Sequence, residues 1–347
     1  MYAVSAWASS HLALCDEKFK GLSLRHRGYA LTRLQESMQQ SELSTEMCLA
    51  VPMVLCSMEP IPEATDSWYP HLTGAAAALT WQPDQPSLPA DPKHAVQATF
   101  EGRWLLRNFP YHDVMMSVSM DCRPLIRGFY WASQDDSLAD PYFGFASRLI
   151  FLISETSVLN ADFAEAPSSS LSQVVDNKSN TNGNGFSNRA SLIEEELQNW
   201  VCPLSEDGSP LELLGEAYLN AALIHLYRTL KRHVSGYSSS LKAKKKACVQ
   251  SICRVSQQLS EGCLVECTLL FPLFIAGGEA EDTPEIETIR GKLCAMGNWR
   301  KFRNVEACID VLDEVWRRRT EGWRRSDQDA VDWLDVVKHR GWKLSIS

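Results

Sequence analysis

The chain has 347 residues, of which 45% are hydrophobic and 22% are charged, and its formal net charge is -9. This composition is ordinary for a globular protein, and the length suffices for one large domain or two ordinary ones. The acidic balance disfavours a free-standing nucleic-acid binder, which usually carries a basic face. No window reaches the roughly 18 continuous apolar residues of a membrane span, and no basic region precedes the first apolar residues, so neither a membrane segment nor a secretory signal is expected.

The first part of the chain reads as helices that give way to a proline-rich break. Residues 1–57 follow helical spacing, and Pro52 predicts a kink or a break in the last of these helices. Residues 68–80 form a short Ala-rich element. Closely spaced prolines over 82–94 then predict an irregular surface loop, because proline lacks an amide donor and restrains its predecessor.

The middle of the chain holds two helical patterns and a break in composition. Residues 95–120 are helical, with Pro110 as a point where the pattern can divide into two helices, and 142–164 are again apolar and helical. Residues 166–190 are rich in Ser, Asn and Gly and offer little apolar surface to offset the entropy of ordering. They are predicted to be a disordered loop inside the fold, with an interdomain linker as the alternative.

The second half of the chain is predicted to be helical almost throughout. A helix over 191–202 starts at Ser191 as N-cap, and 211–233 is apolar on nearly every face and should be central. Further helices are expected over 241–267 and over 305–316, which follows the i, i+3, i+4, i+7 rule. Few segments alternate with period two. We therefore expect an all-α fold, a single large helical domain of stacked antiparallel helices.

The stretch from 269 to 316 is predicted to serve the packing of the core. It opens with an apolar run in which Pro272 is expected to introduce a bend. Gly277 and Gly278 follow and are interpreted as a helix stop, because glycine tolerates positive φ. Trp316 ends the last amphipathic helix and is expected to be buried. All four are predicted to be structural residues.

No reaction centre is apparent in the sequence. There is no Gly-x-Ser-x-Gly elbow and no His-Glu-x-x-His motif. His112 and Asp113 are adjacent, but neighbouring helical positions diverge by about 100°, which disfavours a direct dyad. His225 in its apolar helix is interpreted as a hydrogen-bonded core residue. We predict no catalytic and no cofactor-binding residue, and hence no enzyme.

The cysteines do not form a metal-binding pattern. There are 11, an odd number, scattered mostly through apolar helical segments, as is usual in a reducing compartment. No Cys-x-x-Cys occurs. Cys263 and Cys267 are four residues apart, but no second pair is placed to complete a tetrahedral site. No metal ligand is therefore predicted.

Two kinds of residue leave functional alternatives open. The densest basic cluster is Lys242, Lys244, Lys245 and Lys246, which is typical of a solvated helix start, of a nuclear import signal, or less readily of DNA contact. The late tryptophans favour core packing, with a hydrophobic effector pocket between helices as the alternative. These tryptophans are Trp299, Trp316, Trp323, Trp333 and Trp342.

Six segments in order carry a resemblance to a known family. The segments are HDVMMSVSMDCRPLI at 112–126, DPYFGFASRLIFLISETSVL at 140–159, AYLNAALIHLYRTL at 217–230, LLFPLFIAGGEA at 269–280, 304–316, and Asp332 and Trp333 with Gly341. With these segments, the chain resembles the regulatory, or middle-homology, domain of fungal zinc-cluster transcription factors, in the acriflavine-sensitivity-control-like subgroup. The resemblance covers almost the whole chain.

The resemblance implies an all-helical scaffold that modulates transcription in the nucleus. Such proteins normally begin with a zinc cluster of six cysteines, which this sequence lacks. An abbreviated gene model, an excised domain and a relative without its own DNA reader all remain open. The chain itself is expected to need no cofactor, since zinc would belong to the absent cluster. Its expected partners are other transcription regulators or a second copy, with a small effector as a further option and no tight DNA binding of its own.

Two rival hypotheses belong to other classes. The first is a small-molecule-binding helical protein or a helical enzyme of specialised metabolism, which rests on the aromatic richness of the chain. The second is a protein that only dimerises and so titrates its full-length relatives. Metabolite binding would favour the first, and a pure monomer would count against the second.

Overall fold

Helices make up most of the chain that the computed structural model describes. The predicted loop over 82–94 and the first part of the predicted insert, before residue 181, lie outside the described residues. The described residues are 1–39, 44–58, 67–80, 96–131, 139–140, 142–165, 181–203, 208–234, 238–300, 303–322, 324–326 and 329–347.

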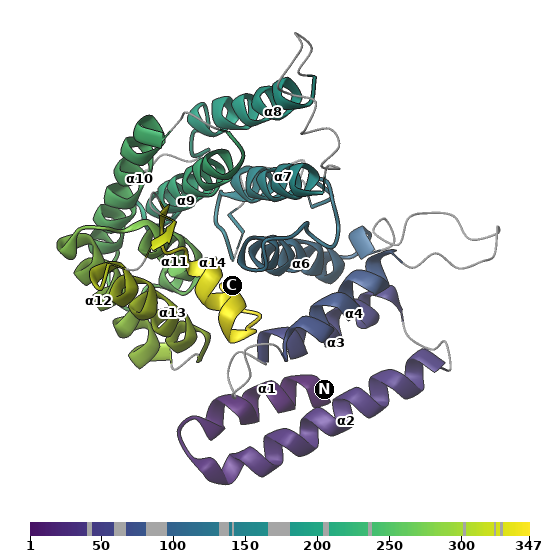
Figure 1. Cartoon of the computed structure of the whole chain (residues 1–347). Helices are drawn as coiled ribbons and strands as arrows, with labels where there is room; N and C mark the ends of the chain where they lie inside the picture. Colours follow the sequence, from purple (N-terminus) through teal and green to yellow (C-terminus); the bar gives the residue numbers. More distant parts are fainter. Residues whose placement is uncertain are drawn as a thin grey trace.

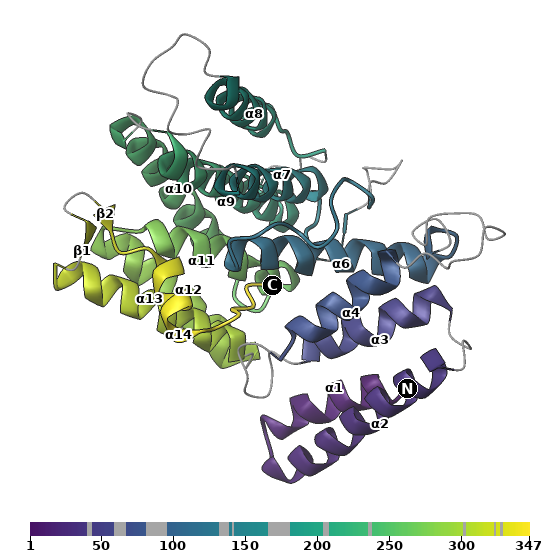
Figure 2. The ribbon, with the colours of Figure 1, turned by 45° about the vertical axis from the view of Figure 1, so that its right-hand side comes forward.

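The N-terminal half begins with an antiparallel helical hairpin at the edge of the molecule (Figures 1 and 2). Two further helices separate this hairpin from the long helices of the body. The elements are α1 (Tyr2–Ala13), the 3-10 helix η1 (Glu17–Phe19), α2 (Lys20–Gln39), α3 (Thr45–Met58), α4 (Tyr69–Thr80), α6 (Phe100–Ser119) and α7 (Ser147–Ala164).

The C-terminal half completes an all-α fold, as predicted. Two short antiparallel strands between the last two helices are the exception. No helix in the described part of the chain is long and apolar enough to span a membrane. The elements are α8 (Thr181–Gln198), α9 (Pro210–His233), α10 (Ser238–Gln258), the 3-10 helix η3 (Leu264–Leu269), α11 (Leu270–Glu279), α12 (Thr283–Arg300), α13 (Arg303–Thr320), β1 (Arg324–Ser326), β2 (Asp329–Ala330) and α14 (Trp333–Arg340).

Helix α9 is the central helix of the body. Its N-cap Ser209 accepts a hydrogen bond from the Glu212 amide at 3.3 Å, and Pro210 occupies the first turn, where no amide donor is needed. It packs against α7, α8, α10 and α11. Burial on most of its faces explains the near-continuous apolar pattern of its sequence. The C-terminal segment after α14 turns back to the middle of the molecule, beside α6 (Figures 1 and 2).

Several predicted helix boundaries were wrong. Neither Pro52 nor Pro110 interrupts its helix, and both lie inside continuous helices, α3 and α6. Almost all of α6 from Leu105 onward is buried, so tertiary packing offsets the backbone hydrogen bond that Pro110 removes. The helix predicted over 241–267 ends at Gln258, because the chain turns at Gly262 with φ of 75° before η3.

The predicted disordered insert was too long at its C-terminal end. Helix α8 begins at Thr181, so Ser191 lies inside it and is not an N-cap. Phe186, Ala190 and Ile193 are buried, as is Leu197 further along the same helix. Their spacing of four, three and four residues forms one apolar stripe, which the Ser/Asn/Gly composition had masked.

The two glycines of the 269–316 stretch are packing positions. Gly277 and Gly278 lie inside α11, which ends one residue later, so the predicted helix stop was wrong. A Cβ atom on Gly277 would come within 2.7 Å of Leu312, and one on Gly278 within 2.3 Å of Trp333. Their missing side chains therefore let α13 and α14 approach α11 closely.

Two residues of the same stretch behave differently from each other. Pro272 lies in the first turn of α11, where a missing amide donor costs little, so it marks the start of a helix and does not bend one. Trp316 is buried as predicted, and its indole N–H donates to the Gly277 carbonyl at 2.9 Å.

Substitution of these glycines provides a test of the close approach. Gly278→Ala should lower the free energy of unfolding by about 1–3 kcal/mol, because the added methyl group overlaps the Trp333 ring. Gly291→Ala, in α12 where an added Cβ would meet no atom of another element within 4 Å, should instead stabilise the protein by up to about 1 kcal/mol. Urea denaturation of both variants measures this difference, and equal effects would contradict the packing role.

Candidate effector pocket

A cavity of about 230 Å³ lies where the N-terminal hairpin, α6, α13 and the C-terminal segment meet. Its lining combines residues of η3, α11 and α12 with aromatic and polar groups from other elements. The residues that matter for its chemistry are Trp7, Tyr111, His112, Tyr142, Asn304 and Ser347.

Stacked aromatic rings form one wall. The rings of Tyr111 and Tyr142 lie 5.6 Å apart at 28°, and the His112 ring lies edge-on to Tyr111 at 5.3 Å. Burial raises the pKa of both tyrosines to about 12, so they are neutral phenols at pH 7. This wall presents flat, polarisable surfaces of the kind that hold planar molecules.

Ser347 holds the polar end of the cavity. The Nδ1 atom of His112 shares a hydrogen bond with Ser347 Oγ at 2.8 Å, and Asn304 Nδ2 donates to the Ser347 carbonyl at 3.2 Å. His112 Nε2 and Asn304 Oδ1 are buried and have no hydrogen-bond partner. Burial lowers the pKa of His112 to about 4, so its ring is neutral at pH 7.

His112 and Asp113 do not form a dyad, in agreement with the sequence argument. The two Asp113 oxygens accept the amides of Leu125 and Ile126, at 2.7 and 3.0 Å. Burial raises the Asp113 pKa to about 7 against the effect of these two hydrogen bonds. The two neighbours therefore serve different parts of the fold.

His225 is a hydrogen-bonded residue of the core. Its Nε2 atom lies 3.1 Å from Ser157 Oγ, and the Ser117 hydroxyl donates to Ser157 at 2.9 Å. Burial, aided by the positive charges of Arg228 and Arg232, lowers the pKa of His225 to about 3.

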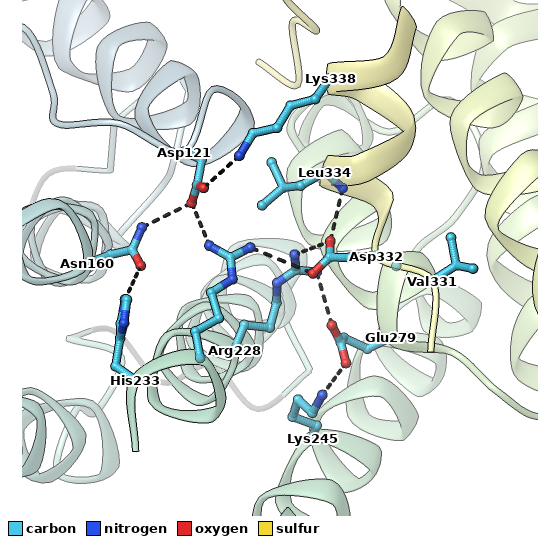
Figure 3. Close-up of polar contacts among 12 residues, drawn as sticks. Asp121, Asn160, Arg228, His233, Lys245, Glu279, Val331, Asp332, Leu334 and Lys338 are labelled. Atoms are coloured by element: carbon cyan, nitrogen blue, oxygen red, sulfur yellow. Dashed lines mark hydrogen bonds and ion pairs between the residues drawn. The ribbon is translucent and has the colours of Figure 1, made fainter. Parts of the chain in front are cut away.

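A second cluster of polar residues lies next to this core and joins α9, α11 and α14 (Figure 3). Arg228, with 6% of its side chain exposed, contacts Glu279 at 3.0 Å and Asp332 at 2.7 Å. Lys245 of α10 pairs with the second Glu279 oxygen. Burial acts to raise the pKa of Asp332, but Arg228 and Arg232 outweigh it and hold this pKa below its usual range.

The same network reaches α7 and the end of α6. Arg232 contacts Asp121 at 2.6 Å, and Lys338 of α14 contacts the other Asp121 oxygen at 3.1 Å. Asn160 donates to Asp121 at 3.0 Å, as Figure 3 shows. Asp121 has a φ of 55°, a left-handed conformation that aspartate tolerates better than most residues. Every group in the network has a partner, which is typical of a network with a structural role.

The predicted basic cluster lies at the start of α10, where each lysine has an acidic partner on another element. Lys245 is in the network described above, with 13% of its side chain exposed. The others pair across the surface: Lys242 with Glu281 at 2.6 Å, Lys244 with Glu194 at 2.6 Å, and Lys246 with Asp282 at 2.7 Å.

The late tryptophans divide between core and surface. Trp333 is buried like Trp316, while Trp342 is half-buried beside Arg340. The side chains of Trp299 and Trp323 lie outside the described residues. Among the described residues, no group of three His, Cys, Asp or Glu side chains is arranged to hold a metal ion.

Comparison with known proteins decides the family. The whole chain, residues 1–347, matches the model of the fungal-specific transcription factor domain. The chain belongs to this family. No curated protein and no solved structure matches the chain significantly.

Membership of the family confirms the resemblance at the level of the domain. A fungal-specific transcription factor domain implies a transcription regulator and a nuclear protein, and it implies no enzyme. The acriflavine-sensitivity-control-like subgroup and the missing zinc cluster stay predictions.

Sequence reasoning missed the surroundings of the cavity and the buried charge network. It weighed His112 only as half of a dyad, although Asn304 and Ser347 complete its surroundings. It also passed over Arg228, a charge within the otherwise apolar run AALIHLYRTL. A buried charge inside an apolar helix requires a partner, and this was the available signal.

The network predicts a large cost for removing its central charge. Arg228→Met should lower the free energy of unfolding by about 3–5 kcal/mol, because Glu279 and Asp332 lose their buried counter-ion. Arg254→Met breaks a half-exposed pair with Glu216 and should cost less than about 1 kcal/mol. Chemical denaturation compares the two, and similar losses would show that the network is no more than a surface feature.

The buried histidines predict acid sensitivity. An unfolded histidine binds a proton below about pH 6.5, whereas folded His225 does so only near pH 3. This contribution to stability is therefore present above pH 6.5 and lost as the pH falls below it. His225→Gln should flatten the decline in unfolding free energy between about pH 6.5 and 4. His339→Gln, on the surface, should leave the slope unchanged, and an identical effect of both variants would refute the assignment.

Proposed function

We propose that this chain is the regulatory domain of a transcription regulator that acts in the nucleus through protein contacts. The observation that carries the proposal is the family match over the whole chain. The hydrogen-bonded, buried setting of His225 and the separate partners of His112 and Asp113 add support, because neither arrangement resembles a reaction centre.

The α1–α2 hairpin is the surface that we assign to these contacts. Tyr2 and Tyr29 are 43% and 56% exposed, and their rings lie 5.5 Å apart across the two helices. Leu24 and Met38 add exposed apolar surface on α2. An exposed pair of aromatic rings such as Tyr2 and Tyr29 is typical of a protein interaction site, in which tyrosine is favoured. The partner that we propose is a second copy of the chain or a related regulator.

The nuclear import signal at Lys242, Lys244, Lys245 and Lys246 stays a prediction. An import receptor would have to break the pairs of Lys242 and Lys246, which are exposed and therefore contribute little to stability. Release of Lys245 costs more, because Lys245 and its partner Glu279 each have only 13% of the side chain exposed. The exposed lysines are therefore the ones that we expect a receptor to use.

A tethering experiment tests the regulatory role. The chain, fused to an unrelated DNA-binding module in a fungal cell, should change the transcription of a reporter several-fold. Tyr29→Arg should reduce this effect and shift the chain towards monomer in light scattering, whereas Leu264→Arg, at a more exposed apolar site elsewhere, should do neither. A nuclear fusion that leaves the reporter unchanged would contradict the proposal.

A further inference from the structure

The walls of the cavity favour an uncharged molecule. No Lys, Arg, Asp or Glu side chain is among its described lining residues, and His112 is neutral at pH 7. An anionic ligand would lose its hydration here without gaining a positive charge, because no Lys or Arg side chain lines the cavity. The aromatic wall of Tyr111 and Tyr142 and the apolar side chains of Leu270 and Met296 favour a flat or apolar body.

Two polar atoms define what the ligand has to carry. His112 and Asn304 are each 9% exposed, and both line the cavity. Asn304 Oδ1 accepts hydrogen bonds only and has no donor, while His112 Nε2 lacks a partner altogether. A buried polar atom without a hydrogen-bond partner costs free energy. A ligand that pairs with both atoms is therefore expected to bind more tightly.

The volume sets the size of the part of a ligand that the cavity can enclose. A cavity of about 150 Å³ holds one benzene molecule. By the same packing, a cavity of about 230 Å³ holds roughly nine or ten non-hydrogen atoms. This corresponds to a single ring with one small polar substituent.

We propose that this cavity binds a neutral, single-ring molecule whose amide or hydroxyl group pairs with His112 Nε2 and Asn304 Oδ1. The ring lies against Tyr111 and Tyr142. The amide or hydroxyl substituent donates a hydrogen bond to Asn304 Oδ1 and forms the hydrogen bond that His112 Nε2 lacks.

The position of the cavity links its occupancy to the hairpin. Trp7 of α1 lines the cavity together with α6 and α13 residues. The hairpin otherwise joins the rest of the molecule mainly through α3. A ligand against Trp7 therefore adds contacts between the hairpin and the body. The regulatory consequence, a hairpin held in place for its partner, rests on the proposed function.

Binding of benzamide to the whole chain tests the proposal. Benzamide carries one ring, one donor group and one acceptor, and benzoate has the same shape with a charge and no donor. By calorimetry, benzamide should bind with a Kd of about 0.1–1 mM, as expected for nine non-hydrogen atoms. Benzoate should bind at least about tenfold more weakly, because it has no donor for Asn304 and its carboxylate would lose hydration without gaining a counter-ion.

Two matched variants test whether benzamide binds in this cavity. Asn304→Leu should weaken benzamide binding about tenfold, since it removes the acceptor. Asn108→Leu changes another buried asparagine with an unpartnered amide group, outside the cavity lining, and should leave binding unchanged. Hydrogen exchange of α1 should slow when benzamide binds.

Three results would overturn the proposal: no benzamide binding, equal binding of benzoate, or unchanged binding by the Asn304→Leu variant. None of them affects the reporter assay, which needs no ligand. A failed reporter assay with intact benzamide binding would instead reject the regulatory role and keep the pocket.

Discussion

The guanidinium group of Arg228 is the contact on which the C-terminal half of the molecule depends. It extends from the central helix α9 and joins the end of α11, through Glu279, to the start of α14, through Asp332. It also lies 4.7 Å from the Trp333 ring, which packs on the bare backbone of Gly278. Because a buried charge has to be paired, three elements distant in sequence are held together. The network is a constraint on geometry more than a source of net stability.

The polar end of the cavity depends indirectly on the Arg228 contacts. Once α14 is fixed at its first turn, the chain after Gly341 turns back, and the Trp68 indole holds the Lys343 carbonyl at 2.8 Å. Ser347 then reaches His112 and Asn304 and sets the orientation of both. The polar end of the cavity is thus built by a segment that the buried network positions from a distance. The aromatic wall belongs to the N-terminal half, so the cavity joins the two halves of the fold.

Local periodicity was enough to predict the fold class and the long helices. The helices over 211–233 and 305–316 follow from apolar spacing, because that spacing reflects one buried face and needs no knowledge of the neighbours. The start of α8 was missed because composition was weighed above its apolar stripe. The role of Gly278 and the pairing of Arg228 could not be predicted, since each depends on a partner far away in sequence. The cavity likewise requires side chains from at least four separate helices.

The most direct test of this account uses Asp332→Asn. Asparagine still caps α14, where Asp332 now accepts the Leu334 amide at 2.9 Å, but it carries no charge for Arg228. The measurement is hydrogen exchange along the chain. The account predicts faster exchange in α14 and in residues 341–347, with α2 unchanged, because the bridge from α9 positions the C-terminal segment. Unchanged protection of that segment would show that the buried network does not position it.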